Sequence, residues 1–430
     1  MRIKIYLVGG ACRDTLLGVE PHDKDYVVVG ATPVEMEFFG YKRVGTDFPV
    51  FLHPETGEEY ALARKEVKTG DKHTDFKFEF GPNVTLEEDL LRRDLTINAI
   101  AKDLKTGKYI DPFNGIQDLK NGVLRHVSEH FIEDPLRVLR LGQFFCRFGF
   151  SIAPETMELC KQMVKGGMLN HLTEERIWAE IEKALHTPNF HKFILFLNEI
   201  DALQVIFPEV SALKDVPENV IYHPEGNAFN HVILTLKQVY NCFFDVDPNV
   251  EVNINEMALV NFGLLCHDLG KAYTDKEKWP AHHGHDVLGI EIINKLCNRL
   301  KIPNEYRDYG ILAGKYHMRY YEFMKCKKKT QFDFVHDVTD NFRYFERLAF
   351  LHRIHRCDLC GRQGKIAPER LENYWIVTKR MNTIFSIMNG ITLKDLPEDT
   401  QQRLLKYKGI VFGQRYREAM ISYMKGKLND

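Results

Sequence analysis

The chain has 430 residues, a formal net charge of −2 and 44% hydrophobic residues. This length predicts roughly two to four domains, and the hydrophobic content is sufficient for ordinary cores. The charge excludes a protein that is basic throughout, although a local basic face can still bind RNA. No stretch approaches about 18 uninterrupted apolar residues, and the N-terminus leads directly into a strand pattern. We therefore expect a soluble, cytoplasmic protein that has no membrane partner.

The nine cysteines are scattered through apolar patterns, which is typical of reduced core residues in a reducing compartment. Cys357 and Cys360 form the only CxxC motif. Because no second pair of ligands lies nearby in the sequence, this motif favours neither a zinc site nor a redox site.

The pattern of elements predicts an α+β fold, with a small mixed sheet at the N-terminus and an all-helical remainder from about residue 113. A helix is expected to begin at Thr32, with Pro33 in its first turn. Short strands are predicted at 3–8, 26–29, 41–44, 49–53 and 58–64.

The first strand runs into Gly9-Gly10-Ala11-Cys12-Arg13-Asp14, and the second begins just after Asp23-Lys24-Asp25. Glycines let the backbone approach a phosphate closely and leave amide donors pointing at it. Asp23 and Asp25 lie two positions apart, which puts both carboxylates on one face wherever the chain is extended, and a metal ion can draw them together. A glycine turn alone would only reverse the chain, but the combined pattern predicts the metal site of a nucleotidyltransferase.

Three further motifs follow in chain order, at residues 92–99 (RRDLTINA), 111–115 (DPFNG) and 133–137 (EDPLR). Together with GGxxRD and DxD, they occur in the order seen in class II CCA-adding tRNA nucleotidyltransferases. The chain most closely resembles the bacterial branch that carries a C-terminal HD phosphohydrolase domain. The resemblance implies a polymerase-β-like nucleotidyltransferase head and addition of CCA to tRNA from CTP and ATP, with release of pyrophosphate.

Phosphoryl transfer needs positioning and charge neutralisation, which two metal ions supply. We expect Asp23 and Asp25 to be catalytic ligands of Mg²⁺. The resemblance places a third carboxylate at Glu59, for which an exposed strand residue is the alternative. Arg13 and the amides of the glycine pair, Gly10 included, are expected to neutralise the phosphates.

Thr85 and Glu88 form a capping box that predicts a helix running through Arg92, Arg93 and Asn98. The two arginines are about 100° apart around the axis, so they cannot serve one face equally. The resemblance assigns the nucleotide contact to Arg93 and leaves Arg92 as a salt-bridge partner. Asp94 and Asn98 are expected to hold the ribose or brace Arg93, and a purely structural salt-bridge cluster is the alternative.

Asp134 precedes a proline and is well placed to begin a helix that presents Arg137 and Arg140 on one face. A carboxylate and a guanidinium can imitate the hydrogen-bonding edge of a base. Asp134 would accept from the exocyclic amine of cytosine or adenine, and Arg137 would donate to the ring. Uracil would oppose its carbonyl to the carboxylate. The alternative is an exposed charged helix.

His231, His267-Asp268 and Asp358 follow the ligand order of HD phosphohydrolases, which bind a divalent transition metal through imidazoles and carboxylates. The resemblance implies Ni²⁺, although these ligands also suit Mn²⁺, Co²⁺ or Zn²⁺. It also implies 2′,3′-cyclic phosphodiesterase, 2′-nucleotidase and phosphatase activities. The histidine-rich loop 280–286 is expected to bind a substrate phosphate, and His317 follows it.

Residues 361–430 contain 13 Lys and Arg against 7 Asp and Glu, and a lysine run lies at 325–329. Basic helices suit the tRNA backbone, but charge runs are often only solvated faces.

Whether the chain is a monomer or a homodimer stays open. The expected domains are the head at 1–112, a helical nucleobase-recognition body at 113–210, the HD domain at 211–360 and the basic tail at 361–430.

The sequence leaves two other functions open. A bacterial poly(A) polymerase shares the head motifs, but it usually has a basic GKRF-type strand where this chain has Gly45-Thr46-Asp47-Phe48. A tRNA-binding protein that has lost catalysis is the second.

The polar segment 65–82 is predicted to be a loop, either solvated or moving over the active site.

Overall fold

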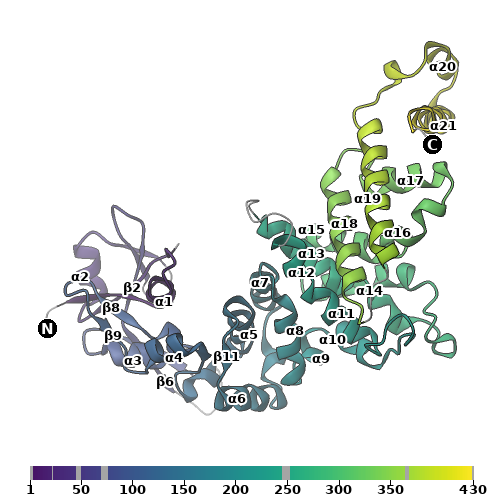
Figure 1. Cartoon of the computed structure of the whole chain (residues 1–430). Helices are drawn as coiled ribbons and strands as arrows, with labels where there is room; N and C mark the ends of the chain where they lie inside the picture. Colours follow the sequence, from purple (N-terminus) through teal and green to yellow (C-terminus); the bar gives the residue numbers. More distant parts are fainter. Residues whose placement is uncertain are drawn as a thin grey trace. The chain divides into compact units, whose positions relative to one another are not determined.

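The computed structural model describes residues 3–21, 23–44, 50–68, 76–244, 252–363 and 368–428. The chain forms two compact units, one of residues 1–184 with 199–202 and one of residues 185–198 with 203–430. Figure 1 shows the strands of the first unit and the helices that make up the second. Each unit is described by itself.

The first unit contains a seven-stranded mixed sheet, which confirms the predicted α+β class. All its strands fall within or beside the predicted ranges up to residue 62. In sheet order the strands are β3 (Lys42–Val44), β4 (Val50–Leu52), β5 (Glu59–Leu62), β2 (Asp25–Val29), β1 (Lys4–Val8), β8 (Ala101–Asp103) and β9 (Tyr109–Ile110).

Strands β2 and β5 are parallel neighbours, and their register pairs Asp25 with Glu59 and Tyr26 with Tyr60. Successive side chains of a strand point to opposite faces, so the two acidic residues share one face and the two tyrosines share the other. The tyrosine rings stack at 4.4 Å between centroids. The stacked pair favours this register over registers that are shifted by one residue.

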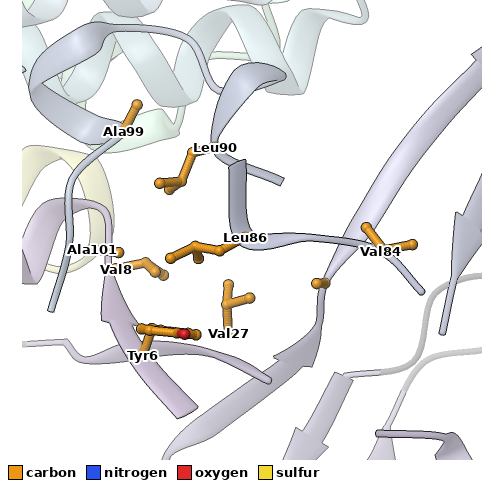
Figure 2. Close-up of a cluster of buried hydrophobic side chains, with 9 residues drawn as sticks. Tyr6, Val8, Val27, Val84, Leu86, Leu90, Ala99 and Ala101 are labelled. Carbon is orange, nitrogen blue, oxygen red and sulfur yellow. The ribbon is translucent and has the colours of Figure 1, made fainter. Parts of the chain in front are cut away.

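A cluster of buried hydrophobic side chains joins one face of the sheet to helix α3 (Leu86–Leu91). In Figure 2, Leu86 and Leu90 point toward Val8, Val27 and Tyr6. Leu90 is fully buried, and no more than 5% of any of these side chains is exposed. Burial of this cluster fixes α3, and with it the residues that follow α3, against the strands that carry the acidic pair.

Two helices begin at the residues that the sequence predicted, and a capping box forms at each start. Thr32 accepts a hydrogen bond from the amide of Glu35 at the start of α2 (Pro33–Phe38), and Thr85 accepts one from Glu88 at the start of α3. The glutamate of each box bonds back to the threonine amide, which satisfies otherwise orphaned donors.

The prediction of a loop at 65–82 was wrong at both of its ends. Strand β6 (Arg64–Lys68) pairs antiparallel with β7 (Phe76–Phe80) in a separate two-stranded sheet. The sequence FKFEF alternates apolar and charged residues with the period of a strand, and this pattern outweighs the overall polarity of the segment. Residues 69–75 of the predicted loop lie outside the described part of the chain.

The remaining elements are almost all helical, as predicted, apart from β10 (Val123–Leu124) and β11 (Ser151–Ile152) in the part of the chain that is described. Helix α1 (Gly10–Leu16) follows the first strand. Later helices up to residue 211 are α4 (Gly115–Asn121), α5 (Leu136–Phe148), α6 (Pro154–Lys165), α7 (Glu174–Leu185), α8 (Phe190–Glu199), α9 (Leu203–Ile206) and α10 (Pro208–Ser211).

Helix α13 (Ile254–Cys266) is buried almost all round, which is typical of the central helix of a bundle. Among the described residues, none of the helices combines the length and apolar character that crossing a membrane requires. The other helices are α11 (Ala228–Lys237), α12 (Val239–Phe244), α14 (His285–Arg299), α15 (Asn304–Tyr316), α16 (Arg319–Glu322), α17 (Lys328–Val338), α18 (Phe345–Cys360), α19 (Pro368–Met388), α20 (Glu398–Leu404) and α21 (Gly409–Lys427).

Single turns of 3-10 helix complete the list: η1 (Thr96–Asn98), η2 (Glu129–Glu133), η3 (Met168–His171), η4 (Ala212–Asp215), η5 (Leu269–Tyr273), η6 (Lys276–Lys278), η7 (Phe323–Lys325) and η8 (Leu393–Asp395).

Candidate active site and metal cluster

A cavity of about 330 Å³ opens beside the acidic pair on β2 and β5. Asp25 and Glu59 are both exposed and both line it. Asp23 is also exposed but is not among the lining residues. The other charged lining residues are Arg64, Asp89, Arg92, Arg93, Asp94, Asp134, Arg137 and Arg140. The structure therefore gathers most of the predicted site residues around one cavity, with carboxylates on the sheet and arginines opposite them.

Each glycine of the pair lies against an arginine, and one of these arginines, Arg93, lines the cavity. Gly9 has a φ of +69°, and a Cβ added to it would lie 2.9 Å from Nη1 of Arg93. Its amide donates to the carbonyl of Ile100, at 3.3 Å. Gly10 begins α1, where a Cβ would lie 3.3 Å from Nη2 of Arg13. A side chain at position 9 would thus displace the Arg93 guanidinium, so the first glycine makes room for an arginine.

Arg13 is buried, with 4% of its surface exposed. Its Nε donates to Asp14 at 2.8 Å and its Nη1 donates to Asn98 at 2.7 Å. The guanidinium also lies over the rings of Phe144 and Phe148, 5.3 and 5.1 Å from their centroids. Arg13 is not among the cavity-lining residues, and its contacts brace α1 against η1 and α5.

The predicted helix through Arg92, Arg93 and Asn98 was wrong, because α3 ends at Leu91. The cause lies in Asp94, whose Oδ1 accepts from the amide of Leu95 at 2.8 Å and from Asn98 at 3.0 Å. Such local side-chain bonds compete with helical hydrogen bonding and turn the chain. The turn aims both arginines into the cavity, which a continuous helix could not do.

The carboxylate of Asp89 binds both Arg92 and Arg93. Its Oδ1 accepts from Arg92 at 3.3 Å, and its Oδ2 accepts from Arg93 at 3.2 Å. Burial would raise the pKa of Asp89, but the charges of Arg93 and Arg92 outweigh burial and lower this pKa below its ordinary value. The carboxylate stays ionised and keeps the two guanidinium groups in place.

We expect Asp89→Asn to lower the free energy of unfolding of the first unit by about 3 kcal/mol, because it leaves two arginines without their buried counter-charge. Urea unfolding followed by the fluorescence of Trp178, the tryptophan of this unit, measures the change. The matched control is Glu87→Gln, an exposed position on the same helix. Equal unfolding midpoints for the two variants would contradict the bracing role.

Arg140 on α5 donates two hydrogen bonds to Oδ2 of Asp94, from Nε at 2.9 Å and from Nη2 at 2.8 Å. Burial would lower the pKa of Arg140, but Asp94 raises it. Paired, charge-assisted bonds of this kind fix geometry as well as adding stability. They tie α5 to the segment that carries Arg92 and Arg93.

Helix α5 begins at Leu136, close to the predicted start, and Asp134 lies just before it. Asp134 accepts from the amide of Leu136 at 3.1 Å and from Arg176 at 2.8 Å. Arg137 donates to the carbonyls of His130 and Arg92, at 2.5 and 2.7 Å. A guanidinium has five N–H donors, so Arg137 keeps donors for a ligand while these two bonds orient it.

The second unit contains a cluster made of the four predicted metal ligands. His231 lies on α11, His267 and Asp268 follow α13, and Asp358 lies on α18. Nε2 of His231 is 2.9 Å from Asp358, and Nε2 of His267 is 3.1 Å from Asp268. No more than 2% of any of the four is exposed. His231, Asp268 and Asp358 line a cavity of about 610 Å³.

The charges of the cluster are balanced by its neighbours. Burial would lower the pKa of His231, but hydrogen bonds to Asp358 and Glu225 raise this pKa to about 9. Lys271 donates to Asp268 at 2.8 Å and to Glu218 at 2.7 Å. A divalent cation bound here must displace the proton on Nε2 of His231, so its affinity falls as the pH falls.

His285, which belongs to the expected phosphate-binding loop 280–286, and His317 also lie in this cluster. Their Nε2 atoms lie 3.6 and 3.4 Å from Oδ1 of Asp268. His285 opens α14 and His317 follows α15, and both helices pack closely with the elements around α13. His267 directly follows an apolar helix, and the other two histidines likewise lie at helix ends. A histidine at the end of a helix was the sequence signal that could have identified them.

Two stretches of the chain match known protein families. Residues 5–125 match the family model described as the "Poly A polymerase head domain". Residues 149–214 match the one described as the "Probable RNA and SrmB- binding site of polymerase A". The first stretch contains the sheet, the acidic pair and the arginines that follow α3.

Several solved structures match nearly the whole chain. A Thermotoga maritima CCA-adding enzyme complexed with tRNA shares 20% identity over 100% of this chain and 88% of its own, with a TM-score of 0.63. A CCA-adding enzyme with ATP shares 22% identity over 98% of this chain and 86% of its own, with a TM-score of 0.61. The chain has the fold of the CCA-adding enzymes.

A third structure, a tRNA nucleotidyltransferase complexed with a primer tRNA and an incoming ATP analogue, shares 22% identity and has a TM-score of 0.57. The match covers 89% of this chain and 96% of that one. Like the matches to the two CCA-adding enzymes, this match extends through the helical unit as well as the first unit. The expected mixed-sheet domain followed by a helical remainder is therefore present.

Proposed function

We propose that the chain adds CCA to the 3′ end of tRNA, using CTP and ATP and releasing pyrophosphate. One observation carries the proposal: Asp25 and Glu59 lie side by side at a cavity that the arginines after α3 and on α5 also line. The fold of the CCA-adding enzymes and the match of residues 5–125 to a polymerase head support it.

The acidic pair offers only carboxylate oxygens, which are the ligands that Mg²⁺ prefers. Asp25 and Glu59 would hold the ions, and Asp23 would supply a further ligand from the start of the strand. When bound, Mg²⁺ lowers the pKa of the attacking RNA hydroxyl and neutralises the triphosphate. The chain itself orients the reactants: Arg93 lies against Gly9 and faces the phosphates, and Arg92 supports it through Asp89.

The nucleobase would be read by Asp134 and Arg137, which border the same cavity. The Asp134 carboxylate accepts from the exocyclic amine of cytosine or adenine, and Arg137 donates to the ring from a position fixed by two backbone carbonyls. Protein side chains then take the place of a nucleic-acid template. Arg140, expected from the sequence to bind the nucleotide, lines the same cavity and is proposed to complete this face while its bonds to Asp94 position α5.

Asp134→Ala should reduce use of CTP and ATP and increase the relative incorporation of UMP, because the uracil carbonyl no longer meets a carboxylate. A hydrogen bond to a charged group is worth roughly 1.5 to 3 kcal/mol, so selectivity for CTP over UTP should fall by about ten- to a hundredfold. The measurement is kcat/KM for each nucleotide on tRNA that ends just before CCA. Glu129→Ala, an exposed position in the preceding turn, is the control. An equal slowing with all four nucleotides would assign Asp134 a structural role.

The proposed function is tested by incubating tRNA that lacks its 3′ end with each nucleotide singly and with CTP and ATP together. Products resolved at single-nucleotide length should stop at CCA. A long adenosine tail would indicate a poly(A) polymerase instead. No extension, with tRNA binding retained, would indicate a binding protein without catalysis.

We also propose a phosphohydrolase activity for the buried cluster of the second unit. His231, His267, Asp268 and Asp358 combine imidazoles with carboxylates, which suit Ni²⁺, Mn²⁺, Co²⁺ or Zn²⁺. The neighbouring cavity is lined by Lys325, Arg362 and Arg370, which suits a phosphate ester. Hydrolysis of 2′,3′-cyclic nucleotides, 2′-nucleotides and phosphomonoesters by the full chain loaded with each ion tests this activity.

The basic tail at 361–430 and the lysine run at 325–329 are proposed to contact the tRNA backbone. The domain boundaries at 112, 210 and 360 and a cytoplasmic location belong to the same proposal. Removal of phosphate contacts should weaken tRNA binding and make it less sensitive to salt, which filter binding at several salt concentrations measures.

A further inference from the structure

The donor atoms of the buried cluster fit a metal ion. Atoms of His231, His267 and Asp358 that could bind an ion all lie within 4.8 Å of one another. Nδ1 of His267 lies 2.7 Å from the carbonyl of Leu264, and a carbonyl can only accept, so this Nδ1 carries the proton. Nε2 of the neutral ring then presents a lone pair, and it has no hydrogen-bond partner among the described residues although His267 is buried. A buried lone pair of this kind favours a bound cation.

The two oxygens of Asp358 face different neighbours. Oδ1 lies 2.9 Å from Nε2 of His231, on the side of the cluster. Oδ2 accepts a hydrogen bond at 3.0 Å from the hydroxyl of Tyr321, on α16. Nη2 of Arg362 is farther from Oδ2, at 3.6 Å, and donates to the Tyr321 oxygen at 2.7 Å. The hydroxyl therefore lies between a proposed metal ligand and an arginine.

The direction of both hydrogen bonds of Tyr321 follows from the chemistry of its partners. An ionised carboxylate can only accept and a guanidinium can only donate, so the hydroxyl donates to Asp358 and accepts from Arg362. The ring is held as well. The ring of His355 lies across it at 4.3 Å between centroids, and the Arg362 guanidinium lies 5.2 Å from its centroid. Tyr321 cannot turn away without losing these contacts, so its hydroxyl has a fixed position.

We propose that Tyr321 is a positioning residue of the buried cluster. Its hydroxyl binds Oδ2 of Asp358 and leaves Oδ1 facing the cluster, where a metal ion would be held. The same hydroxyl orients the guanidinium of Arg362, and Tyr321, Asp358 and Arg362 all line the cavity of the cluster. One hydroxyl thereby couples the metal site to an arginine that is available to a substrate phosphate. The inference rests on the proposed phosphohydrolase function and deepens it.

Tyr321→Phe tests the proposal, because it removes the hydroxyl and keeps the ring. The protein is the full-length chain stripped with a chelator, with Asp25→Asn and Glu59→Gln present so that the first unit contributes no acidic pair. Loss of a group that orients a metal ligand typically costs about ten- to a hundredfold in metal affinity, and we expect a loss of this size for Mn²⁺. The electron paramagnetic resonance signal of free Mn²⁺ gives the affinity. Tyr273→Phe changes an exposed tyrosine that does not line the cavity, and it should bind Mn²⁺ as the parent does.

Arg362→Lys is a second variant, because lysine keeps the positive charge and loses the planar fork that reaches the hydroxyl. We expect a smaller loss of Mn²⁺ affinity, of about three- to tenfold, since Asp358 keeps its bond from Tyr321. Added to Tyr321→Phe, it should cost almost nothing further, because both changes break the same hydrogen bond. Independent, additive losses would contradict the coupling through the hydroxyl.

An unchanged Mn²⁺ affinity in Tyr321→Phe would overturn the proposal, as would an equal loss in Tyr273→Phe. If Tyr321→Phe fails to fold, Arg362→Lys decides, and the parent affinity in that variant overturns the proposal. Weaker Mn²⁺ binding by Tyr321→Phe, in a chain whose parent hydrolyses no phosphate ester, would support the positioning role and remove the phosphohydrolase function. Hydrolysis by the parent, with the same rate and the same Mn²⁺ affinity in Tyr321→Phe, would do the reverse.

Discussion

Asp25→Asn should lower kcat for nucleotide addition by about a thousandfold or more while leaving the affinity for tRNA nearly unchanged. A metal ion contributes several kcal/mol of charge stabilisation in the transition state, and each 1.36 kcal/mol is a factor of ten in rate. Asp25 shares its face of the sheet with Glu59, so its replacement removes half of the acidic pair. Single-turnover addition of CMP to a tRNA that lacks CCA measures the rate, and filter binding measures the affinity.

Glu55→Gln is the matched control, because Glu55 is an exposed carboxylate in the turn before β5 and does not line the cavity. It should keep the parent rate. Asp23→Ala addresses the residue that lies outside the cavity lining, and we expect a comparable loss if it moves to bind an ion. Retention of a tenth or more of the parent kcat by Asp25→Asn would remove this residue from the catalytic site.

Asp268→Asn should abolish hydrolysis of 2′,3′-cyclic nucleotides and leave CCA addition intact. The amide loses the charge that Lys271 and the surrounding imidazoles balance, and it is a poor ligand for a transition metal. We expect a loss of at least about a thousandfold, as for removal of a catalytic metal ion. The two activities are assayed on the same preparation, loaded with Mn²⁺ for hydrolysis and Mg²⁺ for addition.

Glu277→Gln, an exposed carboxylate in the neighbouring 3-10 turn, serves as the control and should retain both activities. Together with Asp25→Asn, the Asp268 variant forms a reciprocal pair, in which each loses one activity and keeps the other. Simultaneous loss of both activities in Asp268→Asn, with an unchanged circular dichroism spectrum, would show that the two sites depend on each other.

The parts of the fold that the sequence predicted well are those governed by local chemistry. The capping boxes at Thr32 and Thr85 specify two helix starts through bonds that span three residues. The strands near residues 4–8 and 25–29 are continuous apolar runs bounded by turns. In such segments the signal lies within a few neighbouring residues, so no tertiary information is needed.

The errors arose where a distant or a side-chain contact decides the structure. The helix after Thr85 was extended too far because the bonds that Asp94 makes to Leu95 and Asn98 compete with the helical pattern. The hairpin of β6 and β7 was missed because its charged residues resemble those of a loop. The burial of Arg13 against Phe144 and Phe148 could not be predicted either, because these rings lie on a helix more than 120 residues away.

The buried histidine and aspartate cluster of the second unit shows the same division. The order of His231, His267, Asp268 and Asp358 was sufficient to predict that they meet, and the structure brings them together. Site assignments within the histidine-rich region required the fold, since His285 and His317 are separated by two helices and come together only through their packing. Sequence order identifies candidate ligands, but it cannot identify which oxygen of Asp268 each one faces.

The register of β2 and β5 makes the proposed catalytic site sensitive to chain length. Deleting or inserting one residue within either strand would bring a tyrosine of the Tyr26 and Tyr60 stack to the face that now carries Asp25 or Glu59. The aromatic pair on the opposite face therefore protects the acidic pair, although neither ring is needed for chemistry. Over evolutionary time, changes of length should be confined to the turns between these strands, while substitutions within the strands remain tolerable wherever the alternation is kept.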